Sequence, residues 1–275
     1  MNSLFFVCGG NAFLAAFLFS ALLLPHLFRG VAAADESDWP RAIEDNSFFI
    51  EEAYNQEPGV IQHISNLNYM KESKDWAFTF TEEWPVPRET HQLSFTIPYL
   101  TSGGGDESGP GDIMLNYRFQ LFGHDDFVTA APRLSVIFPT GSESGGLGNG
   151  VFGMQFNLPV SKRLARDFTA HLNAGFTLFP DAGTEKGAMN LWQYNLGGSV
   201  IWLVTETFNI MAEFAANLEY GLDTTRTYIA SPGLRYAINF DSAQIVPGFA
   251  VPVEFSEGDE NVGFFFYLSI EHQAF

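Results

Sequence analysis

The residues best suited to chemistry are seven charged side chains at polar positions within runs of alternating apolar and polar residues. They are Asp112, Arg118, Arg133, Glu213, Glu219, Arg235 and Glu254. If the runs are strands, these side chains share one face of a sheet with neutral Asn, Gln, Ser and Thr residues. Charges enclosed on such a face can form a ladder that orients a polar solute, or they can simply neutralise one another.

Two of these residues are expected to pair. With strands over 208–222 and 227–240, a hairpin would place Glu213 opposite residue 236. Directly and diagonally opposite residues of neighbouring strands are within reach of each other. The sequence therefore predicts that Glu213 and Arg235 are close enough to pair.

Catalytic chemistry is not indicated. The sequence contains no Gly-x-Ser-x-Gly, no His-Glu-x-x-His and no lysine-containing phosphate loop. Because some barrels of this size are lipases, His171 is the histidine to consider, and it shares a polar face with Thr169 and Asn173. A lone histidine on the enclosed face is the favoured interpretation. We expect no catalytic residues, no metal site and no cofactor.

The elements that must position these residues are strands. In residues 111–122, Leu115 and Tyr117 fall on one face, and Asn116 and Arg118 fall on the other. The same period of two recurs along most of the chain, and a helix would mix the two sets because its period is 3.6. Twelve strands are expected, near 60–70, 75–84, 90–100, 111–122, 127–138, 151–161, 168–179, 189–204, 208–222, 227–240, 243–255 and 261–275.

The strand lengths and connections favour a membrane barrel. Most of the expected strands have roughly the ~9–11 residues that cross a membrane, more than the ~5–6 of ordinary strands. Short connections alternate with longer, glycine-rich or acidic ones, as in outer-membrane barrels, and an even count places both ends in the periplasm. The sequence predicts an all-β, transmembrane, antiparallel up-and-down β-barrel of about twelve strands over residues 60–275.

Five prolines and the last strand depart from this pattern. Proline removes a donor from the strand ladder, and five prolines that fall within the expected strands count against this pattern: Pro132, Pro159, Pro232, Pro247 and Pro252. In the last strand, Phe275 has the parity of Ser269, whereas the apolar set includes Phe264 and Phe266. A bulge near Glu271 would bring Phe275 into register with the apolar face.

The composition supports an apolar exterior. The hydrophobic fraction is 46%, but charged residues make up only 16%, below the ~25% usual in soluble domains. A soluble, secreted β-sandwich with an aromatic core is the alternative. The net charge of −19 excludes nucleic acid as a partner, because an acidic protein repels phosphate backbones.

The N-terminal region precedes the expected barrel. Residues 1–34 have the pattern of a cleaved signal peptide, with an apolar run at Leu14–Leu24 and Ala32-Ala33-Ala34 before Asp35; an uncleaved anchor helix is the alternative. The single cysteine, Cys8, falls inside this signal. Residues 35–59 form an acidic periplasmic segment that either stays loose or plugs the barrel, and the apolar run 48–50 favours docking.

Short motifs at strand boundaries suggest a family. They are Gly111-Asp112-Ile113, Pro139-Thr140-Gly141, Gly148-Asn149-Gly150 and Ser161-Lys162, and they follow the stretch at 48–57. In this order they resemble the transporter-like outer-membrane family named for the meta-pathway of phenol degradation. The resemblance covers most of the mature chain. It implies a barrel and uptake of small molecules, aromatic ones included, and it brings no catalytic residues.

These observations lead to three functional hypotheses. The first is an outer-membrane channel for small, aromatic or hydrophobic molecules. The second is a structural or adhesive barrel with a closed lumen, and the third is the soluble ligand-binding β-sandwich. The expected partners are outer-membrane lipid, lipopolysaccharide, the barrel assembly machinery and a small-molecule solute.

Overall fold

The computed structural model describes residues 47–123, 126–182, 187, 189–221 and 224–274. The predicted signal peptide and residues 35–46 lie outside the described residues. No helix among these residues is long and apolar enough to cross a membrane.

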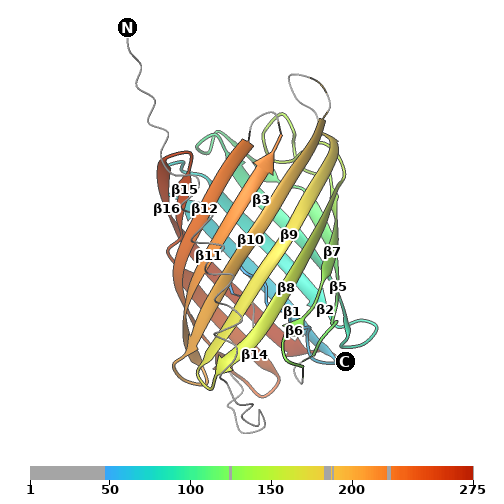
Figure 1. Ribbon diagram of the computed structural model, residues 1–275, viewed down its shortest axis with the longest axis vertical. Helices are drawn as coiled ribbons and strands as arrows, with labels where there is room; N and C mark the ends of the chain where they lie inside the picture. Colours follow the sequence, from blue (N-terminus) through green and yellow to red (C-terminus); the bar gives the residue numbers. More distant parts are fainter. Residues whose placement is uncertain (1–46, 124–125, 183–186, 188, 222–223, 275) are drawn as a thin grey trace. The chain divides into compact units, whose positions relative to one another are not determined.

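The described residues form an antiparallel β-barrel of 12 strands, two of which are interrupted (Figure 1). In chain order the strands are β1 (Val60–Met70), β2 (Trp76–Trp84), β3 (His91–Ser102), β5 (Ile113–Phe119), β6 with β7 (Thr129–Ala130 and Arg133–Phe138), β8 (Gly153–Ala165), β9 (Phe168–Ala182), β10 (Met189–Leu203), β11 (Phe208–Tyr220), β12 (Thr224–Tyr236), β14 with β15 (Ala243–Ala250 and Val253–Ser256) and β16 (Asp259–Gln273). Two short strands lie beside this path: β4 (Glu107–Pro110) pairs with β3, and β13 (Ile238–Asn239) pairs with β14.

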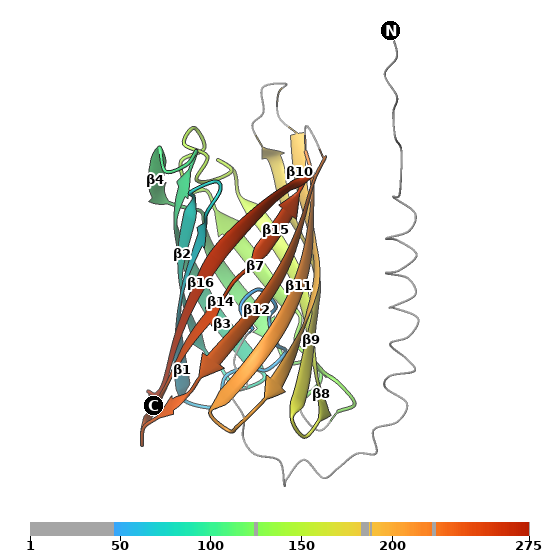
Figure 2. The same cartoon turned by 90° about the vertical axis from the view of Figure 1, so that its left-hand side faces the viewer.

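The sheet closes on itself between its first and last strands. β1 pairs with β16 from Val60 opposite Gln273 to Met70 opposite Gly263, and Figure 2 shows β16 running past β1 and β14 along one side. Closure gives hydrogen-bond partners to the backbone groups of β1 and β16, which would otherwise be edge strands. In hydrocarbon every backbone N–H and C=O group needs such a partner within the protein. The predicted barrel is confirmed, and the alternative of a two-sheet sandwich is wrong.

The two faces of the sheet have the polarity predicted for a membrane barrel. On β5, Leu115 and Tyr117 are 47% and 39% exposed on the outside, whereas Asn116 and Arg118 are 4% and 3% exposed on the inside. Around the barrel, Leu, Phe, Tyr and Trp side chains face outward and Ser, Asn and Gln side chains are buried. This is the reverse of the distribution in a soluble protein. An apolar exterior of this kind suits a lipid bilayer.

The five prolines lie where strand pairing is interrupted. Pro132 separates β6 from β7, and Pro252 separates β14 from β15. Pro159 and Pro232 face these two interruptions, and their carbonyls accept hydrogen bonds from Ala131 and Val251. Pro247 lies between the residues of β14 that pair with β13 and those that pair with β12.

The expected bulge in the last strand is absent from the described residues. β16 keeps one register with β1 and with β14 through Glu271 and His272. Without a bulge, Glu271 stays on the face that it shares with Ser269, and Phe275 lies outside the described residues.

Candidate functional site in the barrel lumen

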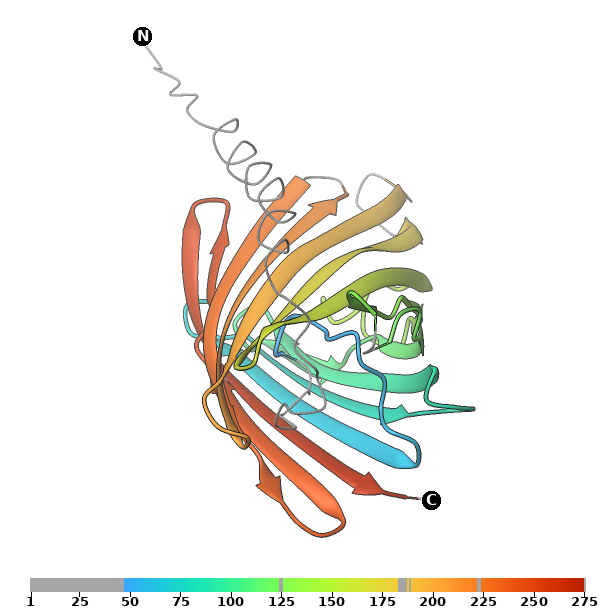
Figure 3. The ribbon, with the colours of Figure 1, turned by 60° about the horizontal axis from the view of Figure 1, so that its bottom comes forward.

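A segment that precedes β1 lies against the inward-facing side chains of the barrel. It comprises residues Ser47–Glu57 and is called the lumen segment below. Figure 3 views the barrel from its lower end and shows this segment in blue inside the ring of strands. Because it forms no strand or helix, its buried backbone groups need partners from the barrel side chains.

The first half of the lumen segment is held by two barrel side chains. The backbone N–H groups of Phe49 and Ile50 both donate to Glu213 Oε1, at 2.9 and 3.2 Å. Asn173 makes a reciprocal pair with Glu51, accepting from its N–H at 2.8 Å and donating to its carbonyl at 2.7 Å. Both barrel side chains bind only backbone groups of the segment, so they fix its path independently of its side chains.

The second half is held in the same way by Ser161 of β8 and by Gln120, which directly follows β5. Ala53 N–H donates to Ser161 Oγ at 2.7 Å, and Gln120 Nε2 donates to the Ala53 carbonyl at 2.7 Å. Gln120 Oε1 in turn accepts from Asn55 N–H at 3.0 Å. Ala53 is fully buried, so a larger side chain there would have to displace its neighbours.

Arg118 binds three successive parts of the segment. Its guanidinium donates to the carbonyls of Glu52 and Tyr54, at 3.3 and 2.6 Å, and to Asn55 Oδ1 at 3.0 Å. The Glu83 carboxylate lies 4.0 Å away on the barrel wall. The planar fork of arginine suits several acceptors in fixed positions, so Arg118 acts as the main clamp on the segment.

Arg133 and Glu51 form a bidentate ion pair. Arg133 Nη2 lies 2.7 Å from Glu51 Oε1, and Nε donates to Oε2 at 3.1 Å. Asn157 Nδ2 also donates to Oε2, at 2.8 Å. The guanidinium is further held by three neutral acceptors: Asn116, Ser135 and Gln155.

The ring of Phe48 fills a notch made by missing side chains. It packs on Phe265 and Tyr267, with ring centroids 5.2 and 5.5 Å apart. A Cβ at Gly233 would lie 2.5 Å from this ring, and one at Gly248 would lie 2.8 Å from it. Only glycine leaves room for the ring at these two positions, so the barrel wall is shaped to receive the segment.

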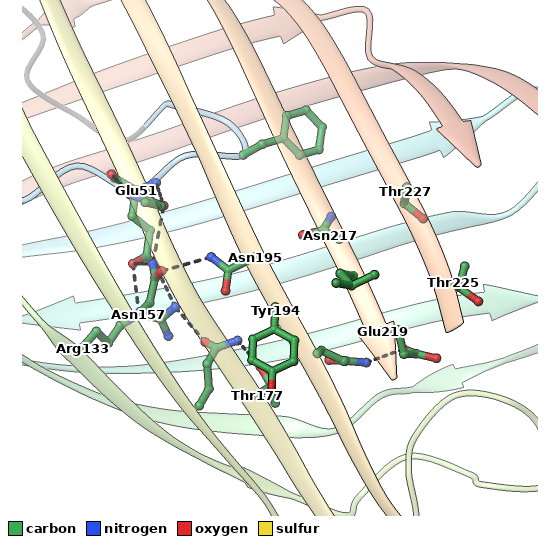
Figure 4. Close-up of a pocket in the computed structure, with 15 residues that line it drawn as sticks. Glu51, Arg133, Asn157, Thr177, Tyr194, Asn195, Asn217, Glu219, Thr225 and Thr227 are labelled. Carbon is green, nitrogen blue, oxygen red and sulfur yellow. Dashed lines mark hydrogen bonds and ion pairs between the residues drawn. The ribbon is translucent and has the colours of Figure 1, made fainter. Parts of the chain in front are cut away.

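Two cavities in the lumen border the lumen segment. The larger, of about 480 Å³, is lined by Phe49, Glu51, Arg133, Gln155, Asn157, Asn173, Thr177, Gln193, Tyr194, Asn195, Asn217, Leu218, Glu219, Thr225 and Thr227. Figure 4 shows the Glu51, Arg133 and Asn157 contacts at one end of it and Glu219 at the other. The second cavity, of about 250 Å³, also borders Phe49, Glu51 and Arg133. Uncharged amides and hydroxyls dominate the larger cavity.

The seven predicted charged residues have different environments. Arg118, Arg133 and Glu213 contact the lumen segment, and Glu219 accepts from Gln193 at 2.8 Å in the larger cavity. Arg235 is fully buried. Glu254 lies opposite Asn261 and is half-buried.

Asp112 belongs to a loop and does not line either cavity. Its carboxylate accepts from the N–H groups of Gly141 and Asn149, at 3.0 and 2.8 Å. These bonds join the start of β5 to the connection between β7 and β8. Asp112 therefore anchors a loop at one end of the barrel.

The predicted register between Glu213 and Arg235 is wrong. Ser231 lies directly opposite Glu213, and Asn209 lies opposite Arg235 and accepts from its Nε at 3.4 Å. The hairpin turns earlier than expected, because pairing continues to Tyr220 opposite Thr224. This shifts β12 by five residues relative to the prediction, from residue 236 to Ser231 opposite Glu213.

His171 has a partner that the sequence did not reveal. Its Nδ1 lies 2.7 Å from Ser161 Oγ, and the ring of Tyr54 meets it edge-on. Both His171 and Ser161 are buried, and Ser161 also accepts from Ala53. The pair therefore supports the lumen segment. Among the residues that the structure describes, no group of three or more His, Cys, Asp or Glu side chains could hold a metal ion.

A closed antiparallel barrel with an apolar exterior and a polar, partly filled lumen defines a transmembrane β-barrel of the outer-membrane type. No protein-family model and no curated protein matches the sequence. An outer membrane channel from Pseudomonas putida F1 has a similar structure, with a TM-score of 0.57 at 12% identity over 80% of this chain and 97% of the channel. The NanC porin gives a TM-score of 0.55 at 9% identity over 76% of this chain and 98% of the porin. At these identities the likeness concerns the fold.

Proposed function

We propose that this protein is an outer-membrane channel for small molecules, and that the lumen segment controls its opening. The observation that carries the proposal is the polar lumen with two cavities that share the wall formed by Phe49, Glu51 and Arg133. A barrel whose interior is simply packed with side chains would not need a cavity of about 480 Å³ lined by amides and hydroxyls. Such groups offer hydrogen bonds to a passing polar solute.

The proposed location follows from the exterior and the N-terminus. The apolar outer face would contact outer-membrane lipid, and residues 1–34 would direct export and be removed. Lipopolysaccharide and the barrel assembly machinery are the corresponding partners. The acidic loops opposite the chain ends would meet lipopolysaccharide through divalent cations.

The second candidate is a structural or adhesive barrel with a permanently closed lumen. The specific observation in its favour is the number of bonds that hold the lumen segment, including the Arg118 clamp and the Glu213 contacts. The two candidates differ in one respect: in a channel the segment must be able to leave or shift.

The chemical nature of the solute is a finer proposal. The resemblance to the phenol-degradation family favours small aromatic or hydrophobic molecules. The aromatic side chains at the lumen segment, Phe48 and Phe49, are consistent with such solutes, because aromatic rings attract one another.

A reversible cross-link tests the channel proposal. The hydroxyls of Ser47 and Ser199 lie 2.8 Å apart, and Cys8 is the only cysteine in the sequence. A Ser47→Cys, Ser199→Cys double variant that begins at Asp35 can therefore be oxidised to tie the segment to β10. Liposome swelling with neutral sugars of graded size should be fast in the reduced protein and slow in the oxidised one.

The single variants provide the matched control, because neither can cross-link within the barrel. A chain that begins at Val60 would add a permanently open form if heat-modifiable gel migration shows that it folds. Equal swelling of the oxidised and reduced double variant would contradict control by the segment. No swelling in any form, the folded shortened chain included, would favour the closed barrel.

A further inference from the structure

The Glu51 carboxylate is bound as a ligand carboxylate would be. It receives two charge-assisted hydrogen bonds from Arg133 and one from Asn157. A guanidinium fork that meets both oxygens of a carboxylate is the geometry by which proteins recognise this group. The site thus holds a complete set of donors for one carboxylate.

Glu51 can leave this site without the rest of the segment. Its backbone N–H and carbonyl are held separately by Asn173. Its side chain is 30% exposed and that of Arg133 is 14% exposed, and both border the two cavities. A rotation of the Glu51 side chain towards cavity water would therefore free the donors of Arg133 and Asn157.

The charge balance changes when Glu51 leaves. Arg118 and Arg133 lie beside two carboxylates, those of Glu83 and Glu51. With Glu51 in place the two positive and two negative charges cancel. Without it one positive charge is in excess, and an anion from outside would restore neutrality.

We infer that the Arg133 and Asn157 donors form a carboxylate-binding site of the channel, that Glu51 occupies it at rest, and that the solute is a small carboxylate that replaces Glu51. The inference rests on the proposed channel function and names the class of its solute. The segment acts as an internal competitor. A solute carboxylate takes over the Arg133 fork and the Asn157 amide, and the Glu51 side chain becomes solvated in the cavity.

Glucuronate and glucose are suitable probes, since they differ at one carbon, which carries a carboxylate in the first and a hydroxymethyl group in the second. Binding to the folded barrel in detergent is measured by calorimetry, and uptake is measured in liposomes. Glu51→Gln removes the competing charge and should tighten glucuronate binding about tenfold. Glu57→Gln is the matched control, because Glu57 is exposed, belongs to the same segment and borders neither cavity.

Replacing the guanidinium of Arg133 tests the donors of the site. Arg133→Lys in the Glu51→Gln background keeps one positive charge but loses the bidentate geometry, so glucuronate binding should weaken about tenfold. Asn157→Leu gives a second variant if Arg133→Lys does not show heat-modifiable migration. Equal binding of glucuronate and glucose by the Glu51→Gln variant would overturn the inference.

The two proposals can fail separately. If glucuronate binds through Arg133 but neither sugar enters liposomes in any variant, the carboxylate site stands and the channel function is contradicted. If both sugars enter at equal rates and Arg133→Lys changes neither, the channel stands and the carboxylate site is contradicted.

Discussion

Gly233 on β12 faces the ring of Phe48 so closely that a Cβ at this position would lie 2.5 Å from the ring. Gly248 on β14 also faces the ring, and a Cβ at that position would lie 2.8 Å from it. Two wall positions without side chains therefore set where the lumen segment begins its path through the barrel.

A Gly233→Val variant should push Phe48 out of its notch. Overpacking costs about 1–3 kcal/mol, which would raise the population with a released segment about fivefold to 150-fold. Liposome swelling with a neutral sugar, or protease cleavage within residues 47–57, would measure this population. Gly123→Ala is the control, because a Cβ there has no neighbour within 4 Å. Unchanged swelling of folded Gly233→Val would show that Phe48 does not hold the segment.

Glu213 is expected to protect two backbone amides. Glu213→Ala leaves the N–H groups of Phe49 and Ile50 without their acceptor, and each unsatisfied buried donor costs about 1–3 kcal/mol. Hydrogen exchange at these two amides should accelerate by about tenfold or more. Glu213→Gln retains an oxygen acceptor and should show a smaller effect. Equal exchange in the two variants would rule out this role of Glu213.

The sequence predicts the barrel well because the alternation is strict. The assignment of Leu115 to the outer face and Asn116 to the lumen needs only a period of two, and the structure confirms it. The hairpin register of Glu213 was not predictable in this way, since a period of two is compatible with several turns. The pairing of Tyr220 with Thr224 differs from the expected register, while every residue keeps its face.

The contacts of the candidate site were less accessible to sequence reasoning. The apolar residues Phe48, Phe49 and Ile50 indicate docking, but nothing local identifies Glu213 or Arg133 as their partners. These contacts join residues more than eighty positions apart. The same separation explains why the sequence did not identify Gly233 as important. Its role depends on the ring of Phe48, which is far away in the sequence.

Asp112 should influence a loop and leave permeation unchanged. Asp112→Ala removes the acceptor of the Gly141 and Asn149 amides, so the connection between β7 and β8 should be cleaved faster by added protease. Single-channel conductance and ion selectivity should remain those of the unmodified protein, because Asp112 borders neither cavity. A changed selectivity would instead place Asp112 on the solute path.

Arg133 and Arg235 should differ in their effect on ion selectivity. Arg133 borders both cavities, so Arg133→Gln removes a positive charge from the permeation path and should shift the reversal potential in a salt gradient towards cation preference. Arg235 is fully buried beside Asn209, and Arg235→Gln should lower thermal stability more than it changes selectivity. The shift for Arg133 should shrink at high salt, since the Debye length falls from about 10 Å at 0.1 M to about 3 Å at 1 M. Equal selectivity shifts in the two variants would mean that the field of the whole barrel, and not the charge at the cavity wall, sets the preference.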